Sequence, residues 1–325
     1  MELMLKLDIP KLEKDITYHS RILMTGSCFT ENMCERLVQA KFQTLSNPNG
    51  ILFNPLSVAD SLNGYLDNKI YTKEELFHLN ELWNSWDHHT RFSHIDAEKA
   101  LEGINLPQNE AADFIKSATH IIITLGSAFQ YYLKETAKPV ANNHRAPAQW
   151  FEKRLLDIET IKTALSSTLT KLFSVNPNVQ VIFTISPVRH IRDGVVDNNR
   201  SKARLMESVH SLCEQFSNCY YFPAYELVID ILRDYRYYDI DFVHPNYLAT
   251  SFIWEQFVNT CMSEPTQNLM KEVQEITTAR SHRPRFAETE AHKTFIAKYA
   301  EKIKLLKEQH PYLDLGGEQA YFSGE

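Results

Sequence analysis

Short uninterrupted runs of apolar residues recur along the chain, and most are followed by a segment with helical spacing. Three of these runs lie at residues 22–25, 120–125 and 179–185. Their shortness and β-branched content predict buried strands. Between them, apolar residues recur every three or four positions, as on one face of a helix. We therefore expect an α/β fold of three layers, α/β/α, with a mainly parallel sheet.

The remaining pattern predicts more elements of both kinds. Helices are expected at 30–39, 55–65, about 156–173, 202–216 and 223–234, and shorter strands at 42–46 and 220–222. Residues 70–110 are less regular. After about residue 246 the pattern becomes helical, with segments at 247–262, 267–279 and 288–309, and residues 316–325 resemble a frayed tail. We expect a first domain over residues 1–262 and a helical extension over 263–325.

Ser27 lies where the first predicted strand gives way to a helix. Gly26 precedes it, and Met33, Leu37 and Val38 have the spacing of a buried helix face, with Glu35 turned towards solvent. A serine here can act as a helix N-cap. It can also act as a nucleophile, because the unpaired N–H groups and the dipole of a helix start favour a developing oxyanion.

The segment at 239–246 contains Asp241 and His244, three residues apart on a predicted loop. A carboxylate at this spacing can reach Nδ1 of the imidazole and fix its tautomer. Nε2 is then free to take a proton from a serine. Ligands of parallel sheets bind at the carboxyl ends of the strands, where both Ser27 and this loop are expected.

Together, these motifs resemble the SGNH/GDSL hydrolase superfamily and, more narrowly, its GSCFA family. The matching stretches are GSCFT at 26–30, NPNGILFNP at 47–55, VANNH at 140–144, SPVRHIRDG at 186–194 and DFVHP at 241–245. The resemblance covers about residues 18–262. It implies a flavodoxin-like sheet and a catalytic triad of Ser27, His244 and Asp241. It also implies that the N–H of Gly50 joins an oxyanion hole with that of Ser27 or Cys28.

One superfamily motif is incomplete in this chain. After the strand at 121–125 the superfamily has Gly-x-Asn-Asp, whereas here Ala128 stands at the asparagine position. The loss of one oxyanion donor can raise a barrier by about 3–4 kcal/mol. Ser127, Asn142 or Asn143 could supply the donor instead, a backbone N–H could serve, or the donor could be absent.

Other residues keep two interpretations. Cys28 could be a thiol nucleophile at a helix start or, as we expect, a core side chain. Arg189 and His190 follow a strand end and could bind an anionic substrate or form a structural ion pair. The Asp87-His88-His89 stretch is expected to be part of a loop and not a metal site, because no third ligand is evident.

The composition and the charge disfavour several classes of function. The formal net charge is −7 with no basic cluster, which disfavours binding to nucleic acid or to an anionic membrane. No apolar run is long enough to span a bilayer, and the N-terminal residues lack the apolar centre of a secretory signal. Five cysteines without a CxxC pair suggest free thiols and a cytoplasmic location. Nucleotide-binding glycine loops are absent.

The sequence thus predicts a serine esterase that needs no metal or organic cofactor. Its substrate is expected to be a small-molecule or carbohydrate ester, on superfamily analogy. The alternative is a non-catalytic binding protein that keeps the same cleft. The pattern does not specify the oligomeric state.

Overall fold

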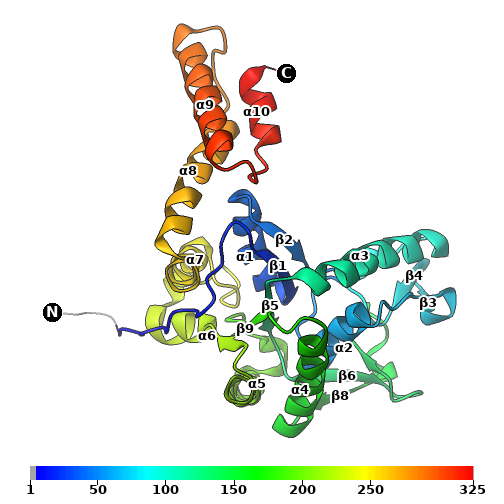
Figure 1. The fold of residues 1–325 in the computed structure, drawn as a ribbon. Coiled ribbons are helices and arrows are strands. Elements are labelled where there is room, and N and C mark those ends of the chain that lie inside the picture. The colour runs from blue at the N-terminus through cyan, green and yellow to red at the C-terminus, as the bar shows by residue number, and fades with distance from the viewer. Residues whose placement is uncertain (1–4, 325) are drawn as a thin grey trace.

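The computed structural model describes residues 5–324. Its centre is a parallel sheet of five strands in the order β10-β9-β5-β1-β2 (Figure 1). The strands are β1 (Arg21–Gly26), β2 (Gln43–Ser46), β5 (His120–Leu125), β9 (Gln180–Ile185) and β10 (Cys219–Tyr221). Every residue of β5 and β9 is buried, as expected for strands covered on both faces. The expected α/β fold with a parallel sheet is confirmed.

Helices cover both faces of this sheet. They are α1 (Cys28–Gln39), α2 (Pro55–Leu66), α3 (Ala97–Ser117), α4 (Ile158–Val175), α5 (Val195–Gln215), α6 (Ala224–Glu226), the π-helical turn Leu227–Leu232 and α7 (Tyr247–Cys261). Alternate residues of β1 divide between two cores: Ile22 and Met24 pack with α1 and α7, and Leu23 packs with α2 to α5. This alternation produces the three layers.

The strand order places the first helix crossover at a switch point. From β1 the chain moves to β2 on one side and then to β5 on the other. In open parallel sheets, ligands bind in the crevice beyond the carboxyl ends of the strands at such a point. Residues that follow β1 and β5 therefore flank the expected crevice.

Several elements were not expected from the sequence. The β3–β4 hairpin (Leu76–Leu79 and Leu82–Ser85) and α3 replace the irregular region predicted at 70–110. Asp96 caps α3 by accepting from the N–H groups of Glu98 and Lys99, and the helix continues through Pro107. A second, antiparallel sheet has the order β7-β6-β8, formed by Phe129–Leu133 (β6), Pro139–Val140 (β7) and Phe151–Leu155 (β8). Short 3-10 turns occur at Lys73–Glu75, Thr90–Phe92, Ala148–Trp150, Ile191–Asp193 and Tyr235–Tyr237.

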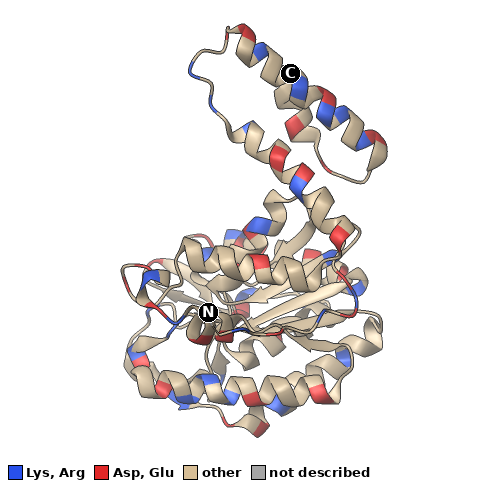
Figure 2. Cartoon of the chain, turned by 90° about the vertical axis from the view of Figure 1, so that its left-hand side faces the viewer, with Lys and Arg blue, Asp and Glu red and all other residues tan. Residues whose placement is uncertain are grey.

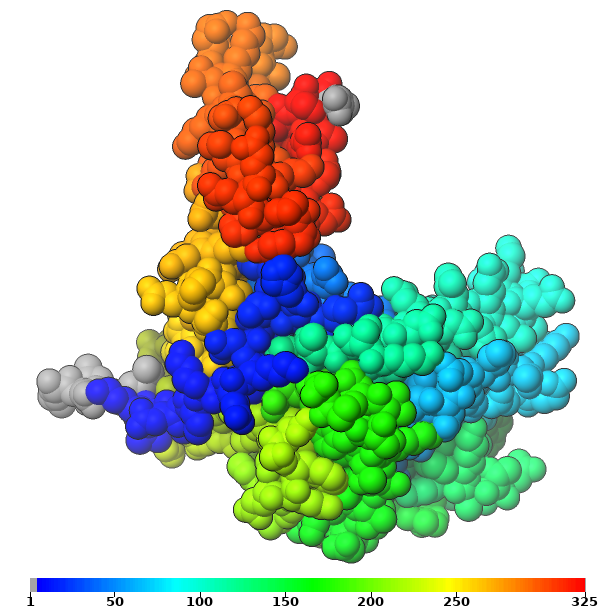
Figure 3. All heavy atoms as spheres, viewed as in Figure 1, coloured from blue at the N-terminus to red at the C-terminus, as the bar shows by residue number. Residues whose placement is uncertain are grey.

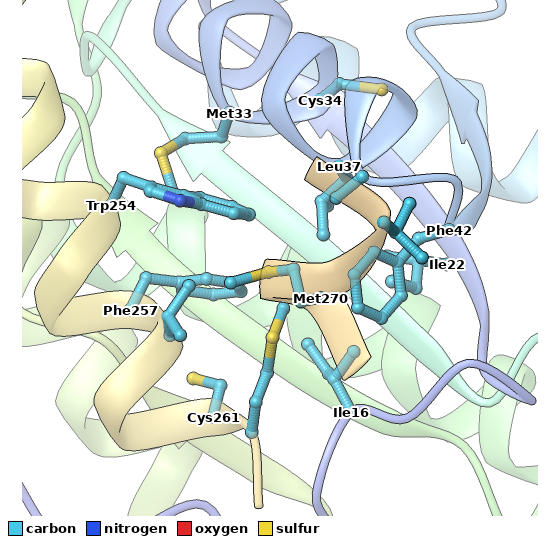
Figure 4. Close-up of a cluster of buried hydrophobic side chains, with 14 of the residues drawn as sticks. Ile16, Ile22, Met33, Cys34, Leu37, Phe42, Trp254, Phe257, Cys261 and Met270 are labelled. Atoms are coloured by element: carbon cyan, nitrogen blue, oxygen red, sulfur yellow. The ribbon is translucent and has the colours of Figure 1, made fainter. Parts of the chain in front are cut away.

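Three C-terminal helices, α8 (Glu264–Ser281), α9 (Glu290–Gln309) and α10 (Gly316–Ser323), project from the sheet as one protrusion (Figures 1 and 3). Charges of both signs are interspersed along α9 (Figure 2). The core below α1 continues into α8, where Met270 lies among Leu37, Phe42 and Phe257 (Figure 4). No helix within residues 5–324 combines the length and apolarity that crossing a bilayer requires.

Residues 316–323 form a packed helix, so the expectation of a frayed tail there was wrong. Phe322 is buried against α9, and Glu318 is buried between Lys41 and Arg280. Each ion pair has a nitrogen–oxygen distance of 2.8 Å. These contacts attach the end of the chain to the turn between α1 and β2. The prediction for Val38 was also wrong, since its side chain is exposed.

Candidate active site

Gly26 fixes the sharp connection between β1 and α1. Its φ is +142°, and a Cβ added there would lie 2.2 Å from the backbone oxygen of Thr124. Only glycine fits this close approach of two strands. The N–H of Gly26 donates to Oδ1 of Asn47 at 2.9 Å, and the N–H of Ser27 donates to the Thr124 oxygen at 3.1 Å. These bonds hold the chain at the end of β1, so α1 begins at Cys28 and Ser27 is the residue immediately before it.

Ser27 occupies the N-cap position but does not act as a cap. Its side chain makes no cap hydrogen bond. The residue is 3% exposed, and its Oγ has no hydrogen-bond partner among the described residues. A buried hydroxyl without a partner costs free energy, so such groups are uncommon in proteins. The N-cap interpretation does not account for this serine.

Asp241 and His244 form the predicted pair. Oδ2 of Asp241 lies 2.6 Å from Nδ1 of His244. The other oxygen, Oδ1, accepts from the N–H groups of His244 at 3.0 Å and Val243 at 2.9 Å. The backbone N–H of His244, its ring and the N–H of Val243 together lower the pKa of Asp241 to about 2. The carboxylate is ionised at neutral pH and leaves Nε2 of His244 free.

Ser27 and this pair line one cleft of about 650 Å³ at the carboxyl ends of the strands. The cleft includes nine of the ten predicted site residues: Ser27, Cys28, Ser127, Asn142, Asn143, Arg189, His190, Asp241 and His244. The side chains of Asp241 and His244 are about half exposed at its rim. No hydrogen bond joins Ser27 Oγ to His244 within the described chain. A direct hydrogen bond between Ser27 and His244 would therefore require the two groups to approach each other.

Gly50 does not fit the oxyanion role predicted for it. Its N–H donates to the backbone oxygen of Asn47 at 2.8 Å, and the described residues that line the cleft do not include it. A glycine is needed here for packing, because φ is +82° and a Cβ would lie 2.2 Å from Cβ of His89. The N–H of Ser27 is also occupied. The N–H of Cys28, in the first turn of α1, has no backbone acceptor in the described part of the chain and can donate into the cleft.

At the position where the superfamily has its oxyanion asparagine, this chain has a packed alanine side chain. Ala128 is fully buried and donates its N–H to Oγ of Ser201 at 2.7 Å. Oγ of Ser127 lies 3.4 Å from the same hydroxyl and accepts from the N–H of Phe129 at 3.2 Å. Ser127 lines the cleft, but its hydroxyl is already used in the wall.

Asn142 and Asn143 are better placed to donate. Oδ1 of Asn142 accepts from the N–H of His144 at 2.8 Å, and Oδ1 of Asn143 accepts from the N–H of Arg145 at 3.2 Å. These bonds orient both amides. Neither Nδ2 group makes a hydrogen bond in the described part of the chain, and both residues line the cleft. Two amide donors are thus available on the wall that carries β7.

Cys28 lies at the cleft and not in the core, which corrects the expectation for this side chain. The residue is partly exposed and lines the cleft beside Ser27. Burial raises the pKa of its thiol, although the N–H of Phe29 opposes that shift. A neutral thiol is a poor nucleophile, so the environment does not favour thiol chemistry at this position.

Lys202 is a buried lysine that the sequence pattern did not single out. It is 1% exposed, and Nζ donates to the backbone oxygens of Gly126 at 2.7 Å and Ser186 at 2.6 Å. Burial lowers its pKa to about 7. Both oxygens follow strand ends, so Lys202 holds the floor of the cleft. It shares the buried face of α5 with Ser201 and Leu205, a placement that the structure shows and the sequence pattern does not.

The Asp87-His88-His89 stretch serves separate networks. His88 is buried, with Nδ1 2.9 Å from Oγ of Ser85 and Nε2 3.1 Å from Nδ2 of Asn49. Burial lowers its pKa to about 3, so the ring is neutral. Asp87 pairs instead with lysines of neighbouring segments. Through its contact with Asn49, His88 stabilises the loop that follows β2.

Comparisons with known proteins agree with the sequence resemblance at the family level. A curated-protein comparison finds no significant match. Among solved structures, the chain is similar to an acetyl xylan esterase from the rumen bacterium Butyrivibrio proteoclasticus, with 11% identity and a TM-score of 0.34. That alignment covers 75% of this chain and 64% of the esterase. The model of the GSCFA family matches residues 21–257, and that of the GSCFA domain protein C-terminal domain matches residues 273–325. Because the first match spans well over half of the chain, this protein belongs to the GSCFA family.

Proposed function

We propose that this protein is a serine hydrolase that cleaves a carboxylic ester through an acyl-enzyme. The observation that carries the proposal is the buried, unpaired Oγ of Ser27 in the cleft that also holds the Asp241–His244 pair. A serine, an imidazole with a free Nε2 and a carboxylate on Nδ1 are the groups that acyl transfer requires. The resemblance of the motifs to the SGNH/GDSL superfamily supports the same chemistry.

In the first step, Ser27 Oγ attacks the ester carbonyl while Nε2 of His244 takes its proton. Asp241 stabilises the imidazolium that results. The N–H of Cys28 and an amide of Asn142 or Asn143 would donate to the oxyanion. His244 then protonates the leaving alcohol, and water releases the acid by the same sequence in reverse. O-acyl groups on a carbohydrate are the proposed substrates, on superfamily analogy.

Substrate would have to bring the His244 loop towards Ser27. In the ligand-free protein the loop is half exposed, and catalytic hydrogen bonds commonly tighten only when substrate binds. Backbone contacts already attach the loop to the cleft: Arg189 donates its N–H to Val243 at 3.4 Å.

A binding protein without turnover is the second candidate. Two observations favour it: the open Ser27–His244 contact and Ala128 in place of the superfamily asparagine. Such a protein would use the same cleft to hold an ester or sugar, and its Ser27 would not react.

Covalent labelling by a fluorophosphonate probe, together with hydrolysis of 4-nitrophenyl acetate, separates the two. We expect labelling and hydrolysis in the wild type and in Cys28→Ala. Ser27→Ala should lose labelling and at least about 10³-fold in rate. Ser117→Ala, which removes an exposed hydroxyl at the end of α3, is the matched control. An unlabelled wild type would favour the binding protein, and labelling lost only in Cys28→Ala would assign the chemistry to the thiol.

A further inference from the structure

Arg189 is a cation of the cleft that the proposed reaction does not use. It follows β9, is partly buried and lines the cleft with Ser27 and His244. Its guanidinium makes no hydrogen bond or ion pair with any described residue, whereas its backbone N–H holds the His244 loop. A structural ion pair, one of the two roles expected for Arg189, is therefore not present.

The charges that line the cleft leave a positive surplus. Lys153, Arg189 and Arg192 are its cations, and Asp193 and Asp241 are its carboxylates. Both carboxylates already have partners, because Lys153 pairs with Asp193, and Asp241 holds the imidazole. Neither arginine forms an ion pair with a residue that the structure describes. This surplus lies on a chain whose formal net charge is −7, so the cleft differs in sign from the protein as a whole.

His190 does not contribute to this charge. Burial, together with the nearby Lys202, lowers the pKa of His190 to about 4, so its ring is neutral near pH 7. Its ring packs against Phe53 with the centroids 5.2 Å apart. Lys202 lies beneath the floor and is held by backbone oxygens. Arg189 is thus the partly buried cation that can meet a ligand in the cleft.

A guanidinium selects for a planar anion. Its fixed fork of N–H groups matches the two oxygens of a carboxylate, and such paired, charge-assisted bonds are stronger than neutral ones. With no acceptor among the described residues, the N–H groups of Arg189 remain available to a ligand in the cleft. Phe129, Tyr131 and Val140 of the antiparallel sheet form an apolar stretch of the wall beside the amides of Asn142 and Asn143. The cleft is therefore suited to a molecule with an apolar or ring surface and one carboxylate.

We propose that the substrates of this site are esters that carry a carboxylate, and that Arg189 binds that carboxylate while Ser27 attacks the ester. This inference rests on the proposed hydrolase function. The carboxylate can belong to the acyl group, as in a dicarboxylic monoester, or to the alcohol, as in an acylated sugar acid. Both place the same anion beside the reacting carbonyl, and Arg189 meets it in either case.

Two pairs of esters test the proposal and separate the two sources. Acyl-side charge is tested by the 4-nitrophenyl monoester of glutaric acid against 4-nitrophenyl pentanoate. Alcohol-side charge is tested by 4-acetoxybenzoate against 4-acetoxybenzamide. Enzymatic kcat/KM values, corrected for spontaneous hydrolysis, are measured for the wild type, Arg189→Gln and Arg200→Gln. Arg200 is an exposed arginine of α5 that pairs with Asp197, so it is the matched control.

We expect the wild type and Arg200→Gln to prefer the anionic ester of at least one pair by about tenfold or more. In Arg189→Gln that ratio should fall by about 10- to 100-fold, mainly through KM. The pair in which the ratio falls identifies the side that carries the charge. An equal kcat/KM for anionic and neutral esters in the wild type, or a ratio unchanged by Arg189→Gln, would overturn the proposal.

A binding measurement keeps this inference distinct from the proposed function. Calorimetry with 4-hydroxybenzoate, the product of the alcohol-side ester, needs no turnover. If the fluorophosphonate does not label the wild type, the hydrolase proposal fails, and Arg189-dependent binding of 4-hydroxybenzoate would still support the anion site. If Ser27 is labelled but neither the ratio nor binding depends on Arg189, the hydrolase proposal stands and the anion site is refuted.

Discussion

The variant Lys202→Met tests whether the buried lysine is held mainly by its two backbone acceptors. Methionine has nearly the same shape and removes both the charge and the N–H donors. A neutral amine has two N–H groups, one for the oxygen of Gly126 and one for that of Ser186. The protonated form has a third, and no further acceptor for it is found among the described residues. The site therefore suits the neutral amine, in agreement with the pKa of about 7.

This shift makes the free energy of unfolding depend on pH. The pKa of Lys202 is about 7 in the folded protein against an ordinary value of 10.5. Between these values the unfolded chain binds more protons, so stability is lowest below pH 7 and rises towards pH 10.5. The rise approaches about 1.4 kcal/mol per pH unit, which gives about 2.5 kcal/mol between pH 6 and pH 9.

Lys202→Met should lose this dependence. The variant also leaves two buried backbone oxygens without donors, at a cost of about 1–3 kcal/mol each. We expect it to be less stable than the wild type at pH 9, with a difference that shrinks by about 2.5 kcal/mol at pH 6. Urea unfolding followed by tryptophan fluorescence from pH 6 to 9 measures this difference. Lys116→Met, at an exposed site on α3, is the control. A difference that is the same at all pH values would refute the reasoning.

Two further variants test the catalytic pair and the C-terminal helices. Asp241→Asn should lower kcat/KM by about 10³- to 10⁴-fold, whereas its exposed loop neighbour in Asp239→Asn should not. The pKa of Asp241 is about 2, so any acid limb of the wild-type pH–rate profile above pH 4 should not arise from this carboxyl. A decrease in kcat/KM of less than tenfold in Asp241→Asn would contradict the role of Asp241. Glu318→Ala should destabilise the protein by about 1–3 kcal/mol in thermal unfolding, since Lys41 and Arg280 lose their carboxylate but remain partly solvated. An effect no larger than that of Glu290→Ala, which breaks an exposed pair on α9, would contradict the packing of α10.

The sheet was predictable from the sequence because its central strands are buried on both faces. Their apolar runs are continuous, so β1, β5 and β9 needed no further context. The helix α3 was missed because alanines supply most of its buried face and Pro107 interrupts the pattern. The short α10 was missed because it begins at two glycines, and its stability comes from Glu318 and Phe322, whose partners are distant in sequence.

The candidate site was predictable for a topological reason. Parallel strands end at one edge of a sheet, so residues that follow separate strands meet there, as Ser27 and Arg189 do. The sequence pattern does not show which acceptor each backbone N–H binds. Gly50 matched a motif, but its N–H closes a local turn. Lys202 was overlooked because a single lysine among the polar residues of an amphipathic helix does not reveal which face it occupies.

The cleft is where this fold departs most from the rules that stabilise the rest of the chain. Among the described residues, Ser27 buries a hydroxyl without a partner, Lys202 buries an amine whose charged form is disfavoured, and Arg189 has a guanidinium without an acceptor. The buried hydroxyl and the buried amine cost stability, and all three groups lie at the carboxyl-end edge of the sheet. Both large cores, by contrast, are filled with apolar side chains. When local conflicts of this kind gather in one crevice, selection for binding and chemistry explains them better than selection for stability. On the two proposals made above, these groups would act on an acyl carbon at Ser27 and on an anion at Arg189.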